Sequence, residues 1–255
     1  MKNKKILGVI PARYASTRFP GKPLVDIWGK TMIRRVYEQC ANSNLFDELI
    51  VATDDVRIEQ EVKGFGGNVM QTKSTHESGT DRCAEVVNKL ETSFDIVVNI
   101  QGDEPFVHNN DLALLINSFE NELVDIATLA ANITSDEELF DANKVKVVFN
   151  NKKLAMYFSR STIPFVRGVE QTNWLTKHKF YKHLGVYAYK TNVLKELGNL
   201  PIGQLESVEH LEQLRWLETG YGIAVQLTDN EVIAVDTPAD LKKILENESL
   251  KPSKD

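Results

Sequence analysis

The chain has 255 residues, of which 42% are hydrophobic and 26% charged, a composition ordinary for a soluble globular protein with a substantial core. Its formal net charge of −6 argues against a general nucleic-acid surface, so an anionic ligand must meet locally concentrated positive charge or a metal. Two cysteines without metal-type spacing, no signal-like start and no apolar run of about 20 residues predict a cytoplasmic protein without a membrane partner.

The first predicted element is a short buried strand over residues 6–10, which is expected to stop at Pro11 because proline cannot donate to a sheet hydrogen bond. The loop that follows carries Arg13, Arg18 and Lys22 among small residues and prolines. In open α/β sheets, ligands bind outside the carboxyl ends of the strands, so this loop suits a polyphosphate. A solvated basic loop is the alternative interpretation.

Strands and helices then alternate along the first half of the chain. The pattern predicts helices at 31–43, 56–65 and from Thr80 to about 90, with Asp81 at the start of the third helix, and strands at 49–52, 68–71 and 95–100. Strand 95–100 is apolar on both faces, as expected for a central strand covered by helices. This alternation predicts parallel β–α–β units.

The second half of the chain has a different pattern. After a helix at 111–122 and a strand at 125–131, the β-forming segments 144–149, 154–159 and 183–190 predict an antiparallel subregion, with a loop at 166–179 around Trp174. One helix is expected over 208–220, capped by Ser207, with Val208 turned inward. A strand at 223–227, a strand ending at Asp236 and a helix capped by Thr237 complete the chain.

Two aspartates that are distant in sequence are predicted to face the same edge of the sheet. Asp103 follows strand 95–100 and Asp236 precedes the last helix. Carboxylates of this kind are ligands for Mg²⁺, which leaves coordination positions open for substrate phosphates. The alternative is that both are turn or cap residues.

Several common catalytic signatures are missing. Neither GxxxxGK[ST] nor GxGxxG after a strand occurs, which argues against a P-loop NTPase and a typical dinucleotide enzyme. There is no GxSxG elbow of a serine hydrolase. No histidine is assigned a role as general base, because a lone histidine is more often structural.

Seven segments, in this order, resemble the 3-deoxy-manno-octulosonate (Kdo) cytidylyltransferase family: PARYASTRFPGKPL, HESGTDR, NIQGDEP, YFSRSTIP, HLGVYAY, EHLEQLR and VDTPADL. The resemblance implies an α/β, Rossmann-like three-layer nucleotidyltransferase fold, with a mostly parallel central sheet and an antiparallel subregion in the second half. It implies a homodimer with Mg²⁺ as cofactor, CTP and Kdo as substrates, and CMP-Kdo and diphosphate as products for lipopolysaccharide synthesis.

The same resemblance implies one domain over 1–255. Within it, residues 1–132 mainly bind CTP, 144–190 serve sugar-acid binding and dimerisation, and 207–246 complete the sugar and metal sites.

Family roles carry over to individual positions. The nucleotide-binding set is Pro11, Ala12, Arg13, Arg18, Lys22, Ser78, Gly79, Thr80 and Arg82. The sugar-acid set is Gln101, Arg160, His183, Glu212 and Gln213, and the metal ligands are Asp103 and Asp236. Arg13, Lys22 and Asp103 are the catalytic residues.

The expected reaction is in-line attack of the anomeric hydroxyl of Kdo on the α-phosphorus of CTP, driven by positioning and charge stabilisation. Three alternatives stay open. The sugar acid could be sialic acid or 8-amino-Kdo, the enzyme could be a glycosyltransferase, or the protein could bind nucleotide without turnover.

Overall fold

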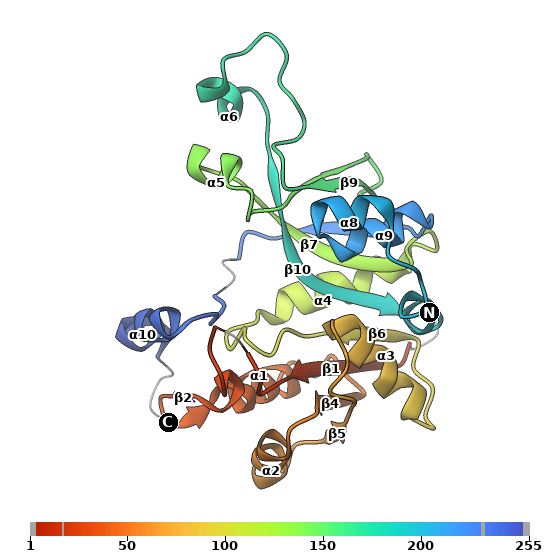
Figure 1. Ribbon diagram of the computed structural model, residues 1–255, viewed down its shortest axis with the longest axis vertical. Helices are drawn as coiled ribbons and strands as arrows, with labels where there is room; N and C mark the ends of the chain where they lie inside the picture. Colours follow the sequence, from red (N-terminus) through yellow and green to blue (C-terminus); the bar gives the residue numbers. More distant parts are fainter. Residues whose placement is uncertain (1–3, 17, 231–232, 252–255) are drawn as a thin grey trace. The chain divides into compact units, whose positions relative to one another are not determined.

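A computed structural model describes residues 4–16, 18–230 and 233–251 of the chain (Figure 1). It divides into two compact units, one formed by residues 1–112 together with 231–255 and the other by residues 113–230. The first division falls inside helix α4, Asn109–Asn117. The prediction of one domain over 1–255 stays a prediction, and each unit is described by itself below.

A parallel sheet forms the centre of the first unit. Its strand order is β6-β1-β4-β5, and each neighbouring pair is parallel. The strands are β1 Ile6–Ala12, β4 Glu48–Thr53, β5 Val69–Gln71 and β6 Ile96–Asn99. All four residues of β6 are buried, as its two-sided apolar pattern predicts.

Helices connect these strands in chain order. They are α1 Met32–Ala41, α2 Val56–Gly64 and α3 Gly79–Lys89. Because crossover connections are right-handed, the path from β1 to β4 and β5 puts α1 and α2 on one face, and the return to β6 puts α3 on the other. The connections therefore change direction between β1 and β6, which is where ligands bind in such sheets.

The expected end of β1 at Pro11 is wrong, since the strand continues to Ala12. The carbonyl of Val9 accepts the backbone N–H of Ile100, so Val9 and, by the period of two, Pro11 face β6. The ladder between these two strands ends at the pair Val9 and Asn99. Pro11 therefore lies beyond the last residue pair of this ladder, so its missing N–H costs no hydrogen bond between β1 and β6.

Two 3-10 helices, a short hairpin and the C-terminal helix also belong to the described part of the first unit. These are the 3-10 helix η1 Lys22–Leu24, the hairpin of β2 Asp26–Ile27 and β3 Lys30–Thr31, α10 Pro238–Glu246 and the 3-10 helix η4 Glu248–Leu250. Ile27, Met32, Val235 and Ile244 share one buried cluster, which fixes α10 beside β2 (Figure 1). Thr237 and Asp240 form the predicted capping box of α10.

The strand predicted to end at Asp236 is not found among the described residues. Residues 231 and 232 lie outside the described residues, and 233–236 are in no strand. A backbone bond from the N–H of Val235 to the carbonyl of Asp103, at 2.9 Å, holds residues 233–236 at the end of β6.

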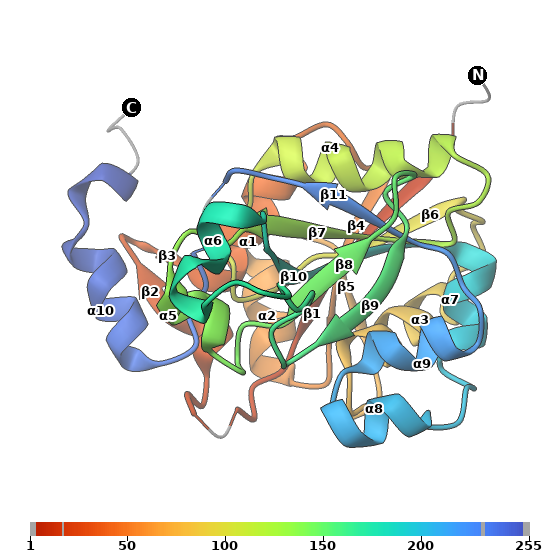
Figure 2. The same ribbon diagram turned by 90° about the horizontal axis from the view of Figure 1, so that it is seen from above.

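The second unit contains the predicted antiparallel strands (Figure 2). Strand β7 pairs with β11 in parallel and with β10 antiparallel; β10 pairs antiparallel with β8, and β8 with β9. The strands are β7 Ile126–Asn132, β8 Lys146–Phe149, β9 Ala155–Ser159, β10 Tyr181–Lys190 and β11 Ile223–Leu227. Parallel pairs in the first unit and mainly antiparallel pairs in the second confirm the predicted α/β class.

Short helices surround these strands. They are the 3-10 helix η2 Ser118–Glu120, α5 Asp136–Phe140, the 3-10 helix η3 Gln171–Asn173, α6 Trp174–Lys177, α7 Thr191–Leu197, α8 Gln204–Glu209 and α9 Glu212–Glu218. The segment predicted as a loop around Trp174 contains η3 and α6, and Trp174 is buried with Phe180 and Leu139. Its indole N–H donates to the carbonyl of Val169 at 3.0 Å.

The single helix expected over 208–220 is wrong. His210 has a left-handed backbone, with φ 53°, so α8 ends before it and α9 begins after Leu211. Val208, predicted to face inward, is 79% exposed. The N-terminal cap of α8 is Gly203 rather than Ser207, and the Glu206 carboxylate accepts the backbone N–H of Gly203 at 3.2 Å.

No helix within the described residues has the length and apolar character needed to span a membrane. Cys40 and Cys83 are both buried.

Candidate active site

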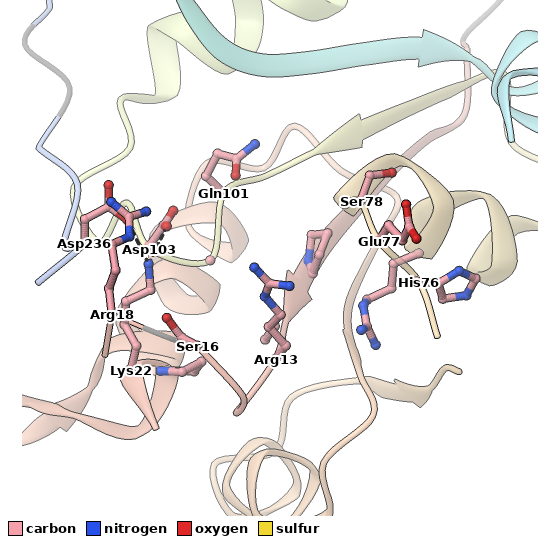
Figure 3. A pocket seen from close by; sticks show the side chains of 16 residues that line it. Arg13, Ser16, Arg18, Lys22, His76, Glu77, Ser78, Gln101, Asp103 and Asp236 are labelled. Atoms are coloured by element: carbon pink, nitrogen blue, oxygen red, sulfur yellow. Dashed lines mark hydrogen bonds and ion pairs between the residues drawn. The ribbon is translucent and has the colours of Figure 1, made fainter. Parts of the chain in front are cut away.

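A cavity of about 350 Å³ lies at the carboxyl ends of β1 and β6 in the first unit, within the range expected for small-ligand sites (Figure 3). Its lining is Pro11, Ala12, Arg13, Ser16, Arg18, Lys22, Pro23, His76, Glu77, Ser78, Gly79, Arg82, Gln101, Gly102, Asp103 and Asp236. Every predicted nucleotide-binding residue except Thr80 lines it, together with both predicted metal ligands and Gln101. Thr80 lies in the first turn of α3 and is buried.

Backbone contacts hold the basic loop in place. The carbonyl of Tyr14 accepts the N–H groups of Ser16 and Gly21, each at 3.0 Å. Gly21 has φ 74°, and a side chain there would lie 3.1 Å from the Tyr14 ring. The guanidinium of Arg57 covers the same ring, 3.2 Å from its centroid. The loop is thus anchored by its own backbone and by α2, in addition to its prolines.

A carboxylate and cation cluster occupies one side of the cavity. The ammonium of Lys22 lies 2.7 Å from Asp103 Oδ2 and 3.3 Å from Asp236 Oδ1. Arg18 Nη2 lies 3.1 Å from the same oxygen of Asp236. The two aspartates therefore converge on one cation position, as expected from their places in the sequence. In Figure 3 this cluster lies opposite His76, Glu77 and Ser78, with Arg13 between the two groups.

Glu104 follows Asp103 and titrates abnormally. Burial, and then the neighbouring charges of Asp103 and Asp111, raise the pKa of Glu104 to about 8. Its carboxyl group is therefore mostly protonated at pH 7 and does not add a third full negative charge beside Asp103.

The strand ends approach one another closely at Gly102. A side chain there would place its Cβ 2.7 Å from the backbone carbonyl oxygen of Pro11. Gly79, at the start of α3, faces Asn99 in a similar way, at 3.2 Å from its side-chain nitrogen. Both glycines let the backbone of β1, β6 and α3 meet around the cavity.

We expect Gly102→Ala to lower the free energy of unfolding by about 1–3 kcal/mol, because the backbone of β1 or of the loop after β6 must shift. Thermal unfolding would measure this loss, and calorimetry would measure a weaker affinity for CTP. Gly64→Ala is the matched control, since a Cβ at Gly64 meets no atom within 4 Å. Equal unfolding temperatures for the Gly102→Ala variant and the wild type would contradict the close approach.

The start of α3 differs from the prediction, which began this helix at Thr80 with Asp81 at its start, since α3 begins at Gly79. Ser78 is the cap: its hydroxyl accepts the N–H of Asp81, and Asp81 accepts the N–H of Ser78. The motif Ser-x-x-Asp carried this signal, because an acid three residues after Ser forms a reciprocal box.

Arg82 lines the cavity, but its guanidinium already contacts side chains of its own unit. It is 4% exposed, and its Nη1 lies 2.5 Å from Thr72 Oγ1 and 3.4 Å from Asp54 Oδ1. The structure thus gives Arg82 a supporting position behind the segment at 72–78.

Ser16, Pro23, His76, Glu77 and Gly102 line the cavity without having been predicted as site residues. His76 Nε2 contacts Glu85 Oε2, an oxygen that also accepts the backbone N–H of Lys73 at 2.9 Å. Burial favours the protonated carboxyl group, but hydrogen bonds from Lys89, Lys73 and His76 outweigh it and lower the pKa of Glu85 to about 2. The Glu85 carboxylate thereby holds the 72–78 segment in place. No local sequence motif indicates these contacts.

Three of the predicted sugar-acid residues lie at or beside the turn between α8 and α9 in the second unit. Arg160, just after β9, donates to backbone carbonyls of the turn between α8 and α9. Glu212 and Gln213 begin α9 directly after that turn, and Gln213 is 5% exposed.

His183 lies on β10 of the same unit. Its Nε2 is 3.0 Å from Thr128 Oγ1, and its ring stands edge-on to Phe158, with centroids 4.9 Å apart. Burial lowers the pKa of His183 to about 3, so the ring is neutral at pH 7. A neutral imidazole can exchange hydrogen bonds with a hydroxyl group but cannot pair with a carboxylate as a cation.

The sequence profile of the cytidylyltransferase family matches residues 7–231. The chain belongs to the cytidylyltransferase family. Among curated relatives, the 3-deoxy-manno-octulosonate cytidylyltransferase of Parabacteroides distasonis is 53% identical over 94% of this chain and 97% of its own length. The enzyme of the same name from Bacteroides thetaiotaomicron is 54% identical over 93% of this chain and 96% of its own length.

Solved structures agree with this family. A CMP:2-keto-3-deoxy-manno-octonic acid synthetase complexed with CTP superposes with a TM-score of 0.87, at 44% identity over 94% of this chain and 97% of that chain. A 4-diphosphocytidyl-2C-methyl-D-erythritol synthase from Anaerococcus prevotii, at 13% identity and TM-score 0.62, shares the fold.

The donor set of this cytidylyltransferase fits a hard divalent cation. Within residues 4–16, 18–230 and 233–251, no cluster of three or more His, Cys, Asp or Glu side chains could hold a metal ion. The two carboxylates around Lys22 supply two oxygen donors, and Mg²⁺ is commonly held by one or two carboxylates together with substrate phosphates and water. Asp103 and Asp236 are therefore the residues that would hold it.

Proposed function

We propose that this protein is a 3-deoxy-manno-octulosonate cytidylyltransferase that converts CTP and Kdo to CMP-Kdo and diphosphate. The observation that carries the proposal is 53% identity over almost the full length of both chains to an enzyme of that name. The CTP complex of a synthetase 44% identical supports the choice of nucleotide. We further propose that it is a cytoplasmic homodimer supplying activated Kdo for lipopolysaccharide synthesis.

In the proposed reaction, the anomeric hydroxyl oxygen of Kdo attacks the α-phosphorus of CTP and diphosphate leaves on the opposite side. Arg13, Arg18 and Lys22 hold the triphosphate and offset the charge that develops on the leaving diphosphate. The main-chain bonds of the loop fix these cations before the substrate binds, so little reorganisation remains for the reaction itself.

We propose that Asp103 and Asp236 hold Mg²⁺ together with CTP. The ion would neutralise phosphate charge and polarise the phosphoryl oxygens. Lys22 supports this assignment, because its ammonium already draws both carboxylates to one position.

For the sugar acid, we propose that Arg160 binds the carboxylate, with Gln101, His183, Glu212 and Gln213 contacting the remaining groups. A guanidinium presents parallel N–H donors that match two carboxylate oxygens. The neutral ring of His183 suits a sugar hydroxyl, given its lowered pKa.

The test is diphosphate release from CTP and Kdo, with Mg²⁺ and with excess EDTA. We expect turnover that needs both substrates and that stops with chelator. Turnover with sialic acid or 8-amino-Kdo but not with Kdo would reassign the sugar acid, and turnover of a sugar nucleotide instead of CTP would favour a glycosyltransferase. CTP binding without diphosphate release from any sugar acid would contradict an enzymatic role.

A further inference from the structure

Glu209, the last residue of α8, is hydrogen-bonded to Ser159 at the end of β9 and to Arg160, which follows it. Its Oε1 accepts the hydroxyl of Ser159 at 2.6 Å, and its Oε2 accepts the backbone N–H of Arg160 at 2.9 Å. Its own backbone carbonyl accepts Arg160 Nε at 2.6 Å. Glu209 therefore forms hydrogen bonds with both the backbone and the side chain of Arg160, which lies 49 positions earlier in the sequence.

The turn after Glu209 completes the support. His210, with φ 53° and ψ 49°, directs its carbonyl towards Arg160 Nη2 at 3.4 Å. On the other side, the carbonyl of Ala142 accepts Arg160 Nη1 at 3.2 Å. Each of the three guanidinium nitrogens therefore has one backbone acceptor.

This arrangement has a consequence for ligand binding. A guanidinium carries five N–H groups, and three carbonyls use three of them. Within the described part of the chain, the other two N–H groups, one on each Nη nitrogen, make no hydrogen bond. Two N–H groups on adjacent nitrogens of a planar fork are the donors that a carboxylate accepts in parallel.

Charge reinforces this assignment. The three acceptors are neutral backbone carbonyls, and no carboxylate of residues 4–16, 18–230 or 233–251 forms an ion pair with the Arg160 guanidinium. The Glu209 carboxylate accepts its hydrogen bonds from the backbone N–H of Arg160 and from the Ser159 hydroxyl, not from the guanidinium. The cation is therefore fixed in position while its charge stays available to an anionic ligand.

We propose that Glu209 is a positioning residue, which fixes Arg160 so that its two remaining N–H groups bind the carboxylate of the sugar-acid substrate. The inference rests on the proposed function, and it adds a residue that does not itself touch the substrate. Loss of Glu209 is expected to weaken sugar-acid binding and to leave CTP binding unchanged.

The test is steady-state kinetics of Glu209→Ala in the full-length protein, with diphosphate release as readout. We expect KM for Kdo to rise about tenfold and KM for CTP to stay within about twofold, since two hydrogen bonds that orient a charged donor are lost. Glu209→Gln should recover most of the loss, because an amide can accept from the Arg160 N–H and donate to the Ser159 hydroxyl.

Glu206 offers a matched control one turn earlier on α8. Its carboxylate accepts two hydrogen bonds from Arg215, both at 2.6 Å, and within the described residues it makes no bond to Arg160. Glu206→Ala should lower the unfolding temperature without raising KM for Kdo. A second control is the double variant with Arg160→Met, in which Glu209→Ala should have no further effect on KM for Kdo if it acts through Arg160.

The possible results distinguish the proposed enzymatic function from the positioning role of Glu209. If the wild type releases no diphosphate with CTP and any sugar acid, the proposed function is wrong and this inference falls with it. If the wild type turns over Kdo but Glu209→Ala leaves KM for Kdo unchanged, or Glu206→Ala raises it equally, the positioning role of Glu209 alone is overturned. An additive effect in the Arg160→Met background would also overturn it.

Discussion

Asp103→Asn is expected to lower kcat for diphosphate release by about 10²–10³-fold, or roughly 3–4 kcal/mol of transition-state stabilisation. The substitution keeps the size of the side chain but removes the charge that meets Lys22 at 2.7 Å and that is proposed to hold Mg²⁺. Because the loss concerns charge that develops in the reaction, kcat should fall more than the affinity for CTP. Turnover at saturating substrates and calorimetry with CTP would measure the two effects.

Asp95→Asn is the matched control for this variant. Asp95 precedes the same strand, β6, at its other end, where its carboxylate accepts the backbone N–H of Lys5 at 2.8 Å. We expect its kcat to equal that of the wild type. If Asp103→Asn kept more than about a third of wild-type turnover at saturating Mg²⁺, Asp103 would not be a catalytic carboxylate.

The convergence of Asp103 and Asp236 could be predicted from sequence because each stands at an abrupt change of pattern. An apolar strand ends just before Asp103, and a helix cap begins just after Asp236. The strand expected before Asp236 is absent at 233–236, yet one main-chain bond from Val235 to Asp103 gives the same placement. Position at the sheet edge was therefore easier to predict than secondary structure.

The break between α8 and α9 could not be predicted from periodicity. Apolar residues continue at helical spacing through it, and His210 is neither a glycine nor an asparagine, the residues that most readily adopt left-handed backbone. The break follows from tertiary contacts, because the carbonyls of Glu209 and His210 turn towards Arg160. Contacts between residues 49 and 50 positions apart leave no local pattern in a sequence.

Residues that hold a site side chain in place are harder to predict from sequence than the site residues themselves. Arg160 lies in a recognisable segment, whereas Glu209 could equally be an exposed helix residue until its bonds to Ser159 and Arg160 are seen. Glu85 behind His76 is a second example. Their roles depend on which side chains the fold brings within 3 Å, and spacing along the chain does not determine that.

Lys22→Met is expected to lower kcat/KM for CTP about a thousandfold, roughly 4 kcal/mol, and Arg18→Met only about tenfold. Exposure accounts for the difference: the Lys22 side chain is 14% exposed and meets both carboxylates, whereas Arg18 is 67% exposed and meets one. Charges shielded from water interact more strongly than charges in solvent. Diphosphate release at limiting CTP would measure both variants.

A second readout distinguishes loss of the Lys22 charge from misfolding. The ammonium of Lys22 and a divalent cation compete for the same oxygens of Asp103 and Asp236, so Lys22→Met should bind Mn²⁺ more tightly than the wild type when no nucleotide is present. Electron paramagnetic resonance titration would measure this, with Lys30→Met as control because Lys30 pairs with Glu38 on α1. Weaker Mn²⁺ binding by Lys22→Met would mean that the two carboxylates do not form one cation site. The same ammonium would then serve to hold the segment before α10 against the end of β6, and the loss of activity would follow from that displacement.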